Sequence, residues 1–128
     1  MALRIVRLGT PRLADEGTRI GTVRRPPRGV PKSAFSSGNW YDVWFPNLAP
    51  SVETMKLGQA ALTEAAWKAF IQAYKAEMSV SDRRHDIALL AALSHAGNFS
   101  LGCYCDNEER CHRSLLRHLL VEAGASIV

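Results

Sequence analysis

Three cysteines and one histidine lie close together near the carboxyl end of the chain. Cys103, Cys105 and Cys111 fall within nine residues, and His112 follows directly. Thiols and imidazoles serve proteins as nucleophiles, as proton carriers and as ligands of soft metal ions. We therefore expect a functional site here, with Cys105, Cys111 and His112 as the candidate catalytic residues.

Three kinds of cysteine chemistry fit this cluster incompletely. A zinc or iron site would use all four side chains, but the paired CxxC pattern is missing, and Cys111 and His112 would point about 100° apart on a helix. We assign no metal ligand from this pattern. A thiol redox pair would join Cys105 to Cys111. A thiol phosphatase or sulfur-transfer loop carries an arginine six residues after its cysteine, whereas the residue six positions after Cys105 is Cys111.

A fourth interpretation, which we favour, is noncovalent recognition of an anion. His112, Arg113 and Ser114 fall near the predicted start of a helix, where free backbone N–H groups and the helix dipole stabilise negative charge. Arg113 would bind anionic oxygens, Ser114 would donate a hydrogen bond, and His112 would act as acid or base. Cys105 lies closest to the predicted helix start, so we expect its thiol to be the most easily ionised.

A second positively charged segment lies far from the cysteines in the sequence. Residues 24–32 contain three prolines, one glycine and four basic residues but no acidic residue. The prolines and the glycine predict a stiffened loop. Its candidate ligand-binding residues are Arg24, Arg28 and Lys32. Because the net charge of the whole chain is only +4, the loop concentrates positive charge and favours recognition of phosphate on a nucleotide or a nucleic acid.

Several of these residues also have an ordinary structural explanation. Cys103 alternates with Phe99 and Leu101 along a predicted strand, which favours a place in the hydrophobic core. His112 shares a helical stripe with several leucines, which fits a buried, hydrogen-bonded histidine as well as a catalytic one. Only the clustering of the four side chains indicates a site.

The secondary structure that must position these residues follows from periodicity and turn signals. Strands are predicted at residues 3–8, 18–23, 40–45, 99–105 and 125–128. Helices are predicted from residue 52, at 62–78, at 82–96 and at 106–123, the last capped by Asp106 with Glu109 completing a capping box. This order favours a single α/β domain over residues 1–128, with a mostly parallel sheet flanked by helices. Ligands bind such sheets at the carboxyl ends of the strands, where the cysteines fall.

Composition narrows the class of protein. With 128 residues, of which 47% are hydrophobic and 22% charged, the chain has the size and composition of one globular domain. It lacks the run of about 20 apolar residues that a membrane span needs, and its start lacks the apolar stretch of a signal peptide. An odd number of cysteines speaks against a secreted disulfide framework. We therefore expect a cytoplasmic protein that does not bind membranes.

Four motifs, in order, resemble the DUF488 family. They are Pro27–Lys32, Trp44 with Leu48–Ser51, Trp67 with Phe70, Tyr74 and Glu77, and Cys105 with the Cys-His-Arg-Ser stretch Cys111–Ser114. The resemblance spans residues 19–123 and implies a compact bacterial or archaeal α/β domain of Rossmann-like or flavodoxin-like type, in a family without an established function. Relatives commonly carry Asp-Arg-hydrophobic-Trp before the Pro-Arg-Gly motif, where this chain has Val23, Arg24, Arg25 and Pro26.

Together these observations predict an enzyme or binding domain whose site joins residues 24–32 to residues 105–114. The expected partner is an anionic small molecule of the nucleotide type. The alternatives are a module that binds nucleic acid or protein, and a thiol redox or metal-binding protein. Nothing in the pattern names a cofactor, a reaction or an oligomeric state.

Overall fold

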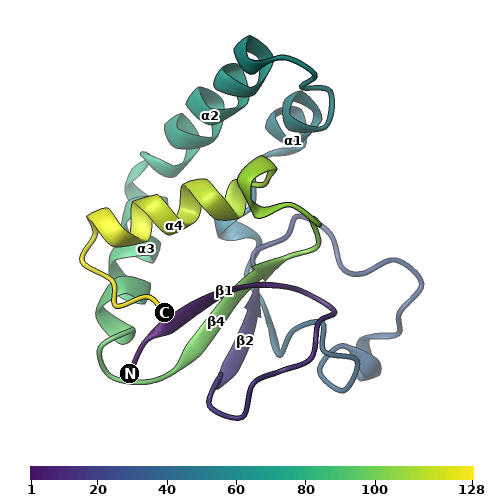
Figure 1. The fold of residues 1–128 in the computed structure, drawn as a ribbon, viewed down its shortest axis with the longest axis vertical. Coiled ribbons are helices and arrows are strands. Elements are labelled where there is room, and N and C mark those ends of the chain that lie inside the picture. The colour runs from purple at the N-terminus through teal and green to yellow at the C-terminus, as the bar shows by residue number, and fades with distance from the viewer.

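A four-stranded parallel sheet forms the centre of the computed structural model, which describes all 128 residues. Its strands are β1 (Leu3–Arg7), β2 (Thr18–Gly21), β3 (Val43–Trp44) and β4 (Phe99–Cys103). They lie in the order β1-β4-β2-β3, so that β4 pairs with both β1 and β2 (Figure 1). The predicted α/β class with a parallel sheet is therefore confirmed.

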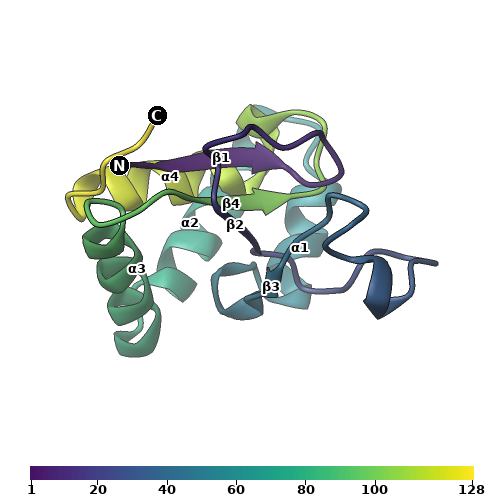
Figure 2. The same cartoon turned by 90° about the horizontal axis from the view of Figure 1, so that it is seen from below.

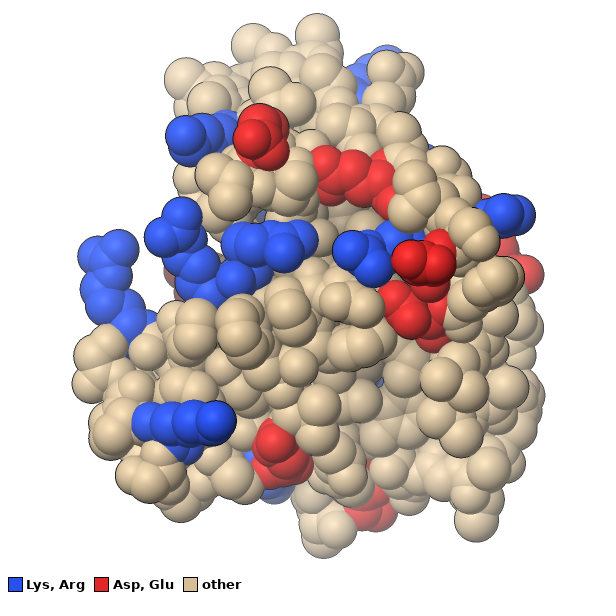
Figure 3. Space-filling view, turned by 180° about the vertical axis from the view of Figure 1, so that it is seen from behind, with Lys and Arg blue, Asp and Glu red and all other residues tan.

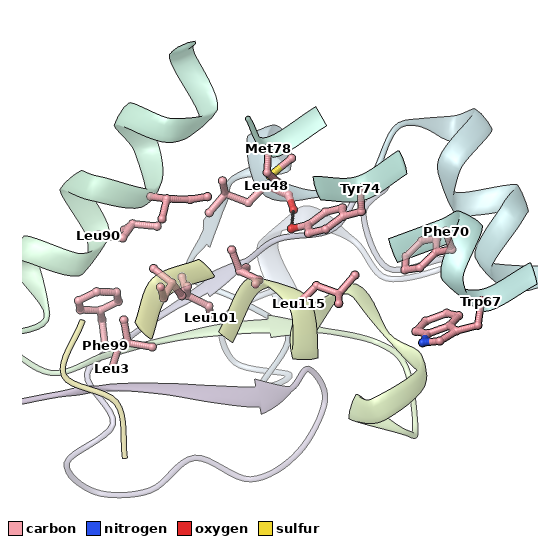
Figure 4. Close-up of a cluster of buried hydrophobic side chains, with 13 residues drawn as sticks. Leu3, Leu48, Trp67, Phe70, Tyr74, Met78, Leu90, Phe99, Leu101 and Leu115 are labelled. Carbon is pink, nitrogen blue, oxygen red and sulfur yellow. Dashed lines mark hydrogen bonds between the residues drawn. The ribbon is translucent and has the colours of Figure 1, made fainter. Parts of the chain in front are cut away.

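The helices gather on one side of this sheet. They are α1 (Val52–Gln59), α2 (Glu64–Met78), α3 (Ser81–Leu93) and α4 (His112–Glu122), with short 3-10 turns at Lys32–Ala34, Pro46–Leu48 and Glu108–Arg110. Seen from below in Figure 2, β1 lies in front of α4, and the close-up in Figure 4 shows helices above the strands. No helix is both long and apolar enough to cross a membrane.

The main hydrophobic core fills the space between the helices and the sheet. On α2, Trp67, Phe70, Tyr74 and Met78 are buried at spacings of three and four residues, which places them on one helical face. The hydroxyl of Tyr74 donates a hydrogen bond of 2.7 Å to the carbonyl oxygen of Leu48, drawn as a dashed line in Figure 4. This bond satisfies the polar end of an otherwise apolar side chain inside the core.

The other side of the sheet is closed by the loop that follows β1. Arg19 and Glu16 are both buried there, with Nε and one terminal nitrogen of Arg19 at 2.7 and 2.9 Å from the two carboxylate oxygens of Glu16. Ser100 of β4 donates to the same carboxylate over 2.7 Å. The remaining nitrogen of Arg19 donates to the carbonyl oxygens of Thr10 and Asn39. This network fixes the loop against β2 and β4.

The predicted helix at 106–123 is wrong at its start. The side chain of Asn107 accepts a hydrogen bond from the Glu109 N–H and begins only the short turn Glu108–Arg110. The backbone at Cys111 is then extended, with φ −132° and ψ 153°, so α4 begins afresh at His112 with Cys111 as its N-cap. Asp106, the expected cap, instead pairs with Arg7.

All five predicted strands are shorter than expected, and two of them are reduced to a few residues. Only Val43–Trp44 of the strand predicted at 40–45 pairs with the sheet, because Asn39 has a positive φ of 63° and Tyr41 is buried in a second apolar cluster. The strand predicted at 125–128 is reduced to one bridge between Leu3 and Ile127. The helices predicted at 62–78 and 82–96 are present as α2 and α3 with shifted ends.

Candidate functional site

A cavity of about 640 Å³ lies at the carboxyl edge of the sheet. Because the strands are parallel, the segments that leave β2 and β4 emerge side by side at this edge. The cavity is bounded by these segments, by α1, by the first turns of α2 and by the start of α4. Its volume falls within the range of about 300–1,000 Å³ that is usual for small-molecule sites.

The wall of the cavity carries five basic residues and one acidic residue. The basic residues are Arg24, Arg25, Arg28, Lys56 and Arg110, and the acidic residue is Asp106. On the face drawn in Figure 3, Lys and Arg side chains gather in a band, with Asp and Glu side chains at one end of it. The charged part of the cavity wall is therefore mainly positive.

Three of these cations make no side-chain interaction within the molecule. Arg24 donates to the carbonyl oxygens of Ala49 and Pro50, and Arg110 pairs with Glu64. In contrast, no ion pair or side-chain hydrogen bond of the molecule engages the side chains of Arg25, Arg28 or Lys56. These three are the cations available to a ligand.

The thiol cluster forms another part of the wall. Cys103 and Cys111 are buried, at 6% and 2% exposure, whereas Cys105 is exposed, and all three thiols are free. The Sγ atoms of Cys103 and Cys105 are 3.7 Å apart, and Sγ of Cys111 is 3.7 Å from Nδ1 of His112. The ligand atoms of Cys103, Cys111 and His112 all lie within 4.8 Å of one another.

Thr22 holds His112 in a defined orientation. Nε2 of His112 lies 2.8 Å from the carbonyl oxygen of Thr22. A carbonyl oxygen only accepts hydrogen bonds, so Nε2 carries the proton and Nδ1 faces Cys111. The hydroxyl of Thr22 is itself anchored, because it donates over 3.0 Å to the carbonyl oxygen of Gly102. The end of β2 thus fixes which nitrogen of His112 meets the thiol.

Cys111 is the thiol of the cluster that ionises first. Hydrogen bonds from Cys103 and Cys105 lower the pKa of Cys111 against the effect of burial, and His112 lowers it further. Hydrogen bonding to Cys105 and Cys111 raises the pKa of Cys103. Cys103 lowers the pKa of Cys105, but Cys111 and burial raise it more, to about 11. The sequence predicted that the Cys105 thiol would ionise most easily, but Cys111 accepts hydrogen bonds from both other thiols and is the thiol whose pKa falls overall.

Two of the candidate ligand-binding residues support the turn from behind the cavity wall. Arg113 is buried, and it donates a 2.6 Å hydrogen bond to the carbonyl oxygen of Cys105. The hydroxyl of Ser114 donates to the carbonyl oxygen of Cys111 over 3.0 Å. Neither residue lines the cavity, and Lys32, which begins a 3-10 turn, does not line it either.

The structure therefore brings together only part of the predicted site. The candidates that line the cavity are Arg24, Arg28, Cys105, Cys111 and His112. Further residues that line or support the cavity, and that the sequence pattern did not indicate, are Thr22, Lys56, Trp67 and Tyr104. Thr22 directly follows β2 at the same sheet edge as the cysteines, and that position was a usable signal. Lys56 and Trp67 depend on how α1 and α2 pack, which no local pattern shows.

Fold and site together define a small parallel α/β domain with a thiol–histidine cluster at the carboxyl edge of its sheet. A family model described as the "Active DUF488-N3 subclade" matches residues 3–124. The chain therefore belongs to the DUF488 family, as its four motifs indicated. No curated protein and no solved structure matches the chain.

Proposed function

We propose that the protein is an enzyme that binds a phosphate-bearing ligand of the nucleotide type and acts on it at the Cys111–His112 pair. One observation carries this proposal: a single cavity is lined by unpaired cations, by aromatic rings and by that pair. The first two features fit the two halves of a nucleotide. The Cys111–His112 pair lies in the wall of the same cavity, where a bound ligand would contact it.

The cations fit the phosphate of such a ligand. Arg25, Arg28 and Lys56 line the cavity without carboxylate partners, so a phosphate would not have to displace an existing ion pair. Guanidinium groups bind phosphate oxygens through paired, charge-assisted hydrogen bonds. Arg28 belongs to the proline-rich loop, and a stiff loop loses little entropy when it binds.

The aromatic residues fit the base. The hydroxyl of Tyr104 donates over 2.9 Å to the carbonyl oxygen of Arg25, which ties this ring to the basic loop. Tyr104 also lines a second hollow of about 450 Å³, together with Arg28 and Trp40. Trp67 also borders the main cavity, but it is buried, with Phe70 stacked on its ring and the guanidinium of Arg110 lying 5.2 Å from its ring centre. The ring of Tyr104 is therefore the aromatic surface on which a nucleobase would stack.

The Cys111–His112 pair supports chemistry beyond binding. Its sulfur and nitrogen lie 3.7 Å apart at the amino end of α4, where the helix dipole favours negative charge. Thr22 keeps the acceptor nitrogen of His112 toward the sulfur. In a fixed thiol–imidazole pair, a proton can pass between the sulfur and the nitrogen. Either group can also exchange a proton with a bound ligand. The free thiols also support the expected cytoplasmic setting, because thiols stay reduced there.

Calorimetric titration with matched ligands and variants tests this proposal. The ligands are AMP, ADP, ATP and GMP, with adenosine and inorganic phosphate as controls that each lack one half. We expect at least one nucleotide to bind more tightly than either control. Arg28→Ala should weaken the binding of that nucleotide about tenfold or more, because it removes a charge-assisted hydrogen bond worth about 1.5–3 kcal/mol. Lys32→Ala, in the same loop but outside the cavity, should leave affinity unchanged.

Two results would contradict the proposal. One is that no nucleotide binds more tightly than adenosine and phosphate. The other is that Arg28→Ala and Lys32→Ala behave alike. With a bound nucleotide identified, Cys111→Ser should retain binding and abolish conversion, which is followed by chromatography of the ligand.

A further inference from the structure

We propose that Cys103, Cys111 and His112 bind one Zn²⁺ ion, whose fourth coordination position lies on the cavity side. The inference rests on the proposed function for the ligand that would meet the metal, and it specifies the cofactor of the same site. In the metal-bound protein Cys111 and His112 are both ligands of the ion and no longer exchange protons with the substrate. The ion is then the group that a bound substrate contacts.

The donor atoms lie close to the spacing that tetrahedral coordination requires. With Zn–S near 2.3 Å and Zn–N near 2.0 Å, a tetrahedral ion holds sulfur and nitrogen ligands about 3.5 Å apart and two sulfur ligands about 3.8 Å apart. Cys111 Sγ and His112 Nδ1 are 3.7 Å apart, and the three donor atoms lie within 4.8 Å of one another. Small side-chain movements are enough to close them around one ion.

The backbone at Cys111 allows two successive residues, Cys111 and His112, to bind the same ion. Two successive residues within a helix point about 100° apart. Cys111, however, is the N-cap of α4 and has extended φ and ψ angles, while His112 is the first helical residue. Their donor atoms can therefore converge, as the short Cys111–His112 distance shows.

His112 already has the support that zinc-binding histidines use. Such a histidine donates its second ring N–H to a carboxylate or a backbone carbonyl, which fixes the ring and exposes the other nitrogen to the metal. Here Nε2 donates to the carbonyl oxygen of Thr22, and Nδ1 faces the thiols. The hydroxyl of Thr22 donates in turn to Gly102, so the whole support is anchored in the sheet.

Charge and burial favour three protein ligands over four. All three proposed ligands are buried, and two thiolates with Zn²⁺ and a neutral imidazole form a group of zero net charge. A neutral group is the one that costs least to bury. Cys105 is exposed, and its sulfur lies 3.7 Å from that of Cys103 at the cavity wall. It is a neighbour of the site and is not required to bind the ion.

A Cys₂His set with one open position is the arrangement of a catalytic zinc rather than a closed structural one. The open position would hold a water molecule, and the ion would lower the pKa of that water. When a phosphate ligand is bound there, the ion would instead polarise one of its oxygens. The basic residues that line the same cavity would hold that ligand beside it.

Metal analysis of the intact protein and its cysteine variants tests the inference. Purified wild-type protein should contain one zinc per chain by elemental analysis. Cobalt should replace it and give sulfur-to-cobalt charge-transfer bands with the strong visible bands of a four-coordinate ion. Cys103→Ser and Cys111→Ser should lose the bound metal, whereas Cys105→Ser should keep it. Because the first two variants could fail to fold, a chelator titration of wild type measures the zinc affinity independently, and zinc removal should lower its Tm.

The outcomes separate this inference from the proposed function. Protein that holds no zinc and gives no cobalt spectrum overturns the zinc site, even where the same preparation binds nucleotide. Equal metal loss in Cys105→Ser and Cys111→Ser overturns the three-ligand assignment. Stoichiometric zinc in a protein that binds no nucleotide upholds the site and contradicts the proposed function.

Discussion

The buried ion pair between Glu16 and Arg19 should be the polar interaction whose loss costs the fold most. Glu16→Ala removes a carboxylate that accepts from two nitrogens of Arg19, at 2.7 and 2.9 Å, and from Ser100 at 2.7 Å. It leaves a buried guanidinium without its counter-charge. Breaking one side of a buried pair costs about 3–5 kcal/mol.

That loss is large against the stability of a chain of this size. At about 0.05–0.15 kcal/mol per residue, 128 residues give roughly 6–19 kcal/mol in total. A loss of about 3–5 kcal/mol corresponds to a decrease in Tm of roughly 10–20 °C. The measurement is urea unfolding followed by tryptophan fluorescence, with the slope of the transition checked to be unchanged.

The neighbouring residue provides the control. Asp15 forms an exposed ion pair with Arg4 at 3.5 Å, so Asp15→Ala should cost less than about 1 kcal/mol. If Glu16→Ala does not fold, Glu16→Gln keeps the shape and loses the charge, and it should still cost more than Asp15→Ala. Equal costs at the two positions would refute the reasoning.

Three further predictions concern acid stability, the core and the class of ligand. Burial raises the pKa of Asp42, but hydrogen bonds from Arg12 and other groups lower it more, to about 2. The stability that Asp42 contributes is therefore complete above its ordinary pKa near 3.8 and is lost as the pH falls toward 2, so unfolding midpoints of wild type and Asp42→Asn should converge over that range. Tyr74→Phe should cost about 1 kcal/mol in urea unfolding, because it leaves the Leu48 carbonyl oxygen without its 2.7 Å donor; no change would contradict the bond. Nucleotide affinity should fall only modestly between about 50 and 200 mM salt, whereas a steep loss of oligonucleotide binding measured by anisotropy would favour a nucleic-acid module.

Features that depend on local periodicity could be predicted from the sequence. The stripe of Trp67, Phe70, Tyr74 and Met78 appears in α2 as buried side chains because helical spacing alone puts them on one face. The position of Cys103 at the carboxyl edge followed from strand alternation and from the parallel arrangement of an α/β sheet.

Features that depend on single tertiary contacts could not be predicted from the sequence. The capping pattern at residues 106–109 is real but closes only a 3-10 turn, because the extended backbone at Cys111 interrupts it. Arg113 follows His112 in a motif that suggests ligand binding, yet its guanidinium is held by the Cys105 carbonyl. Glu16 and Arg19 are spaced like an ordinary surface pair, and contacts with distant residues such as Asn39 and Ser100 bury them.

A crystal structure with a bound nucleotide is the most direct test of the proposed function. The nucleotide is the one that binds most tightly in the calorimetric panel. We predict its phosphate within hydrogen-bond distance of Arg28 or Lys56, its base against Tyr104, and its reacting end toward Cys111 and His112. A nucleotide bound outside this cavity, or with its phosphate away from these cations, would contradict the account.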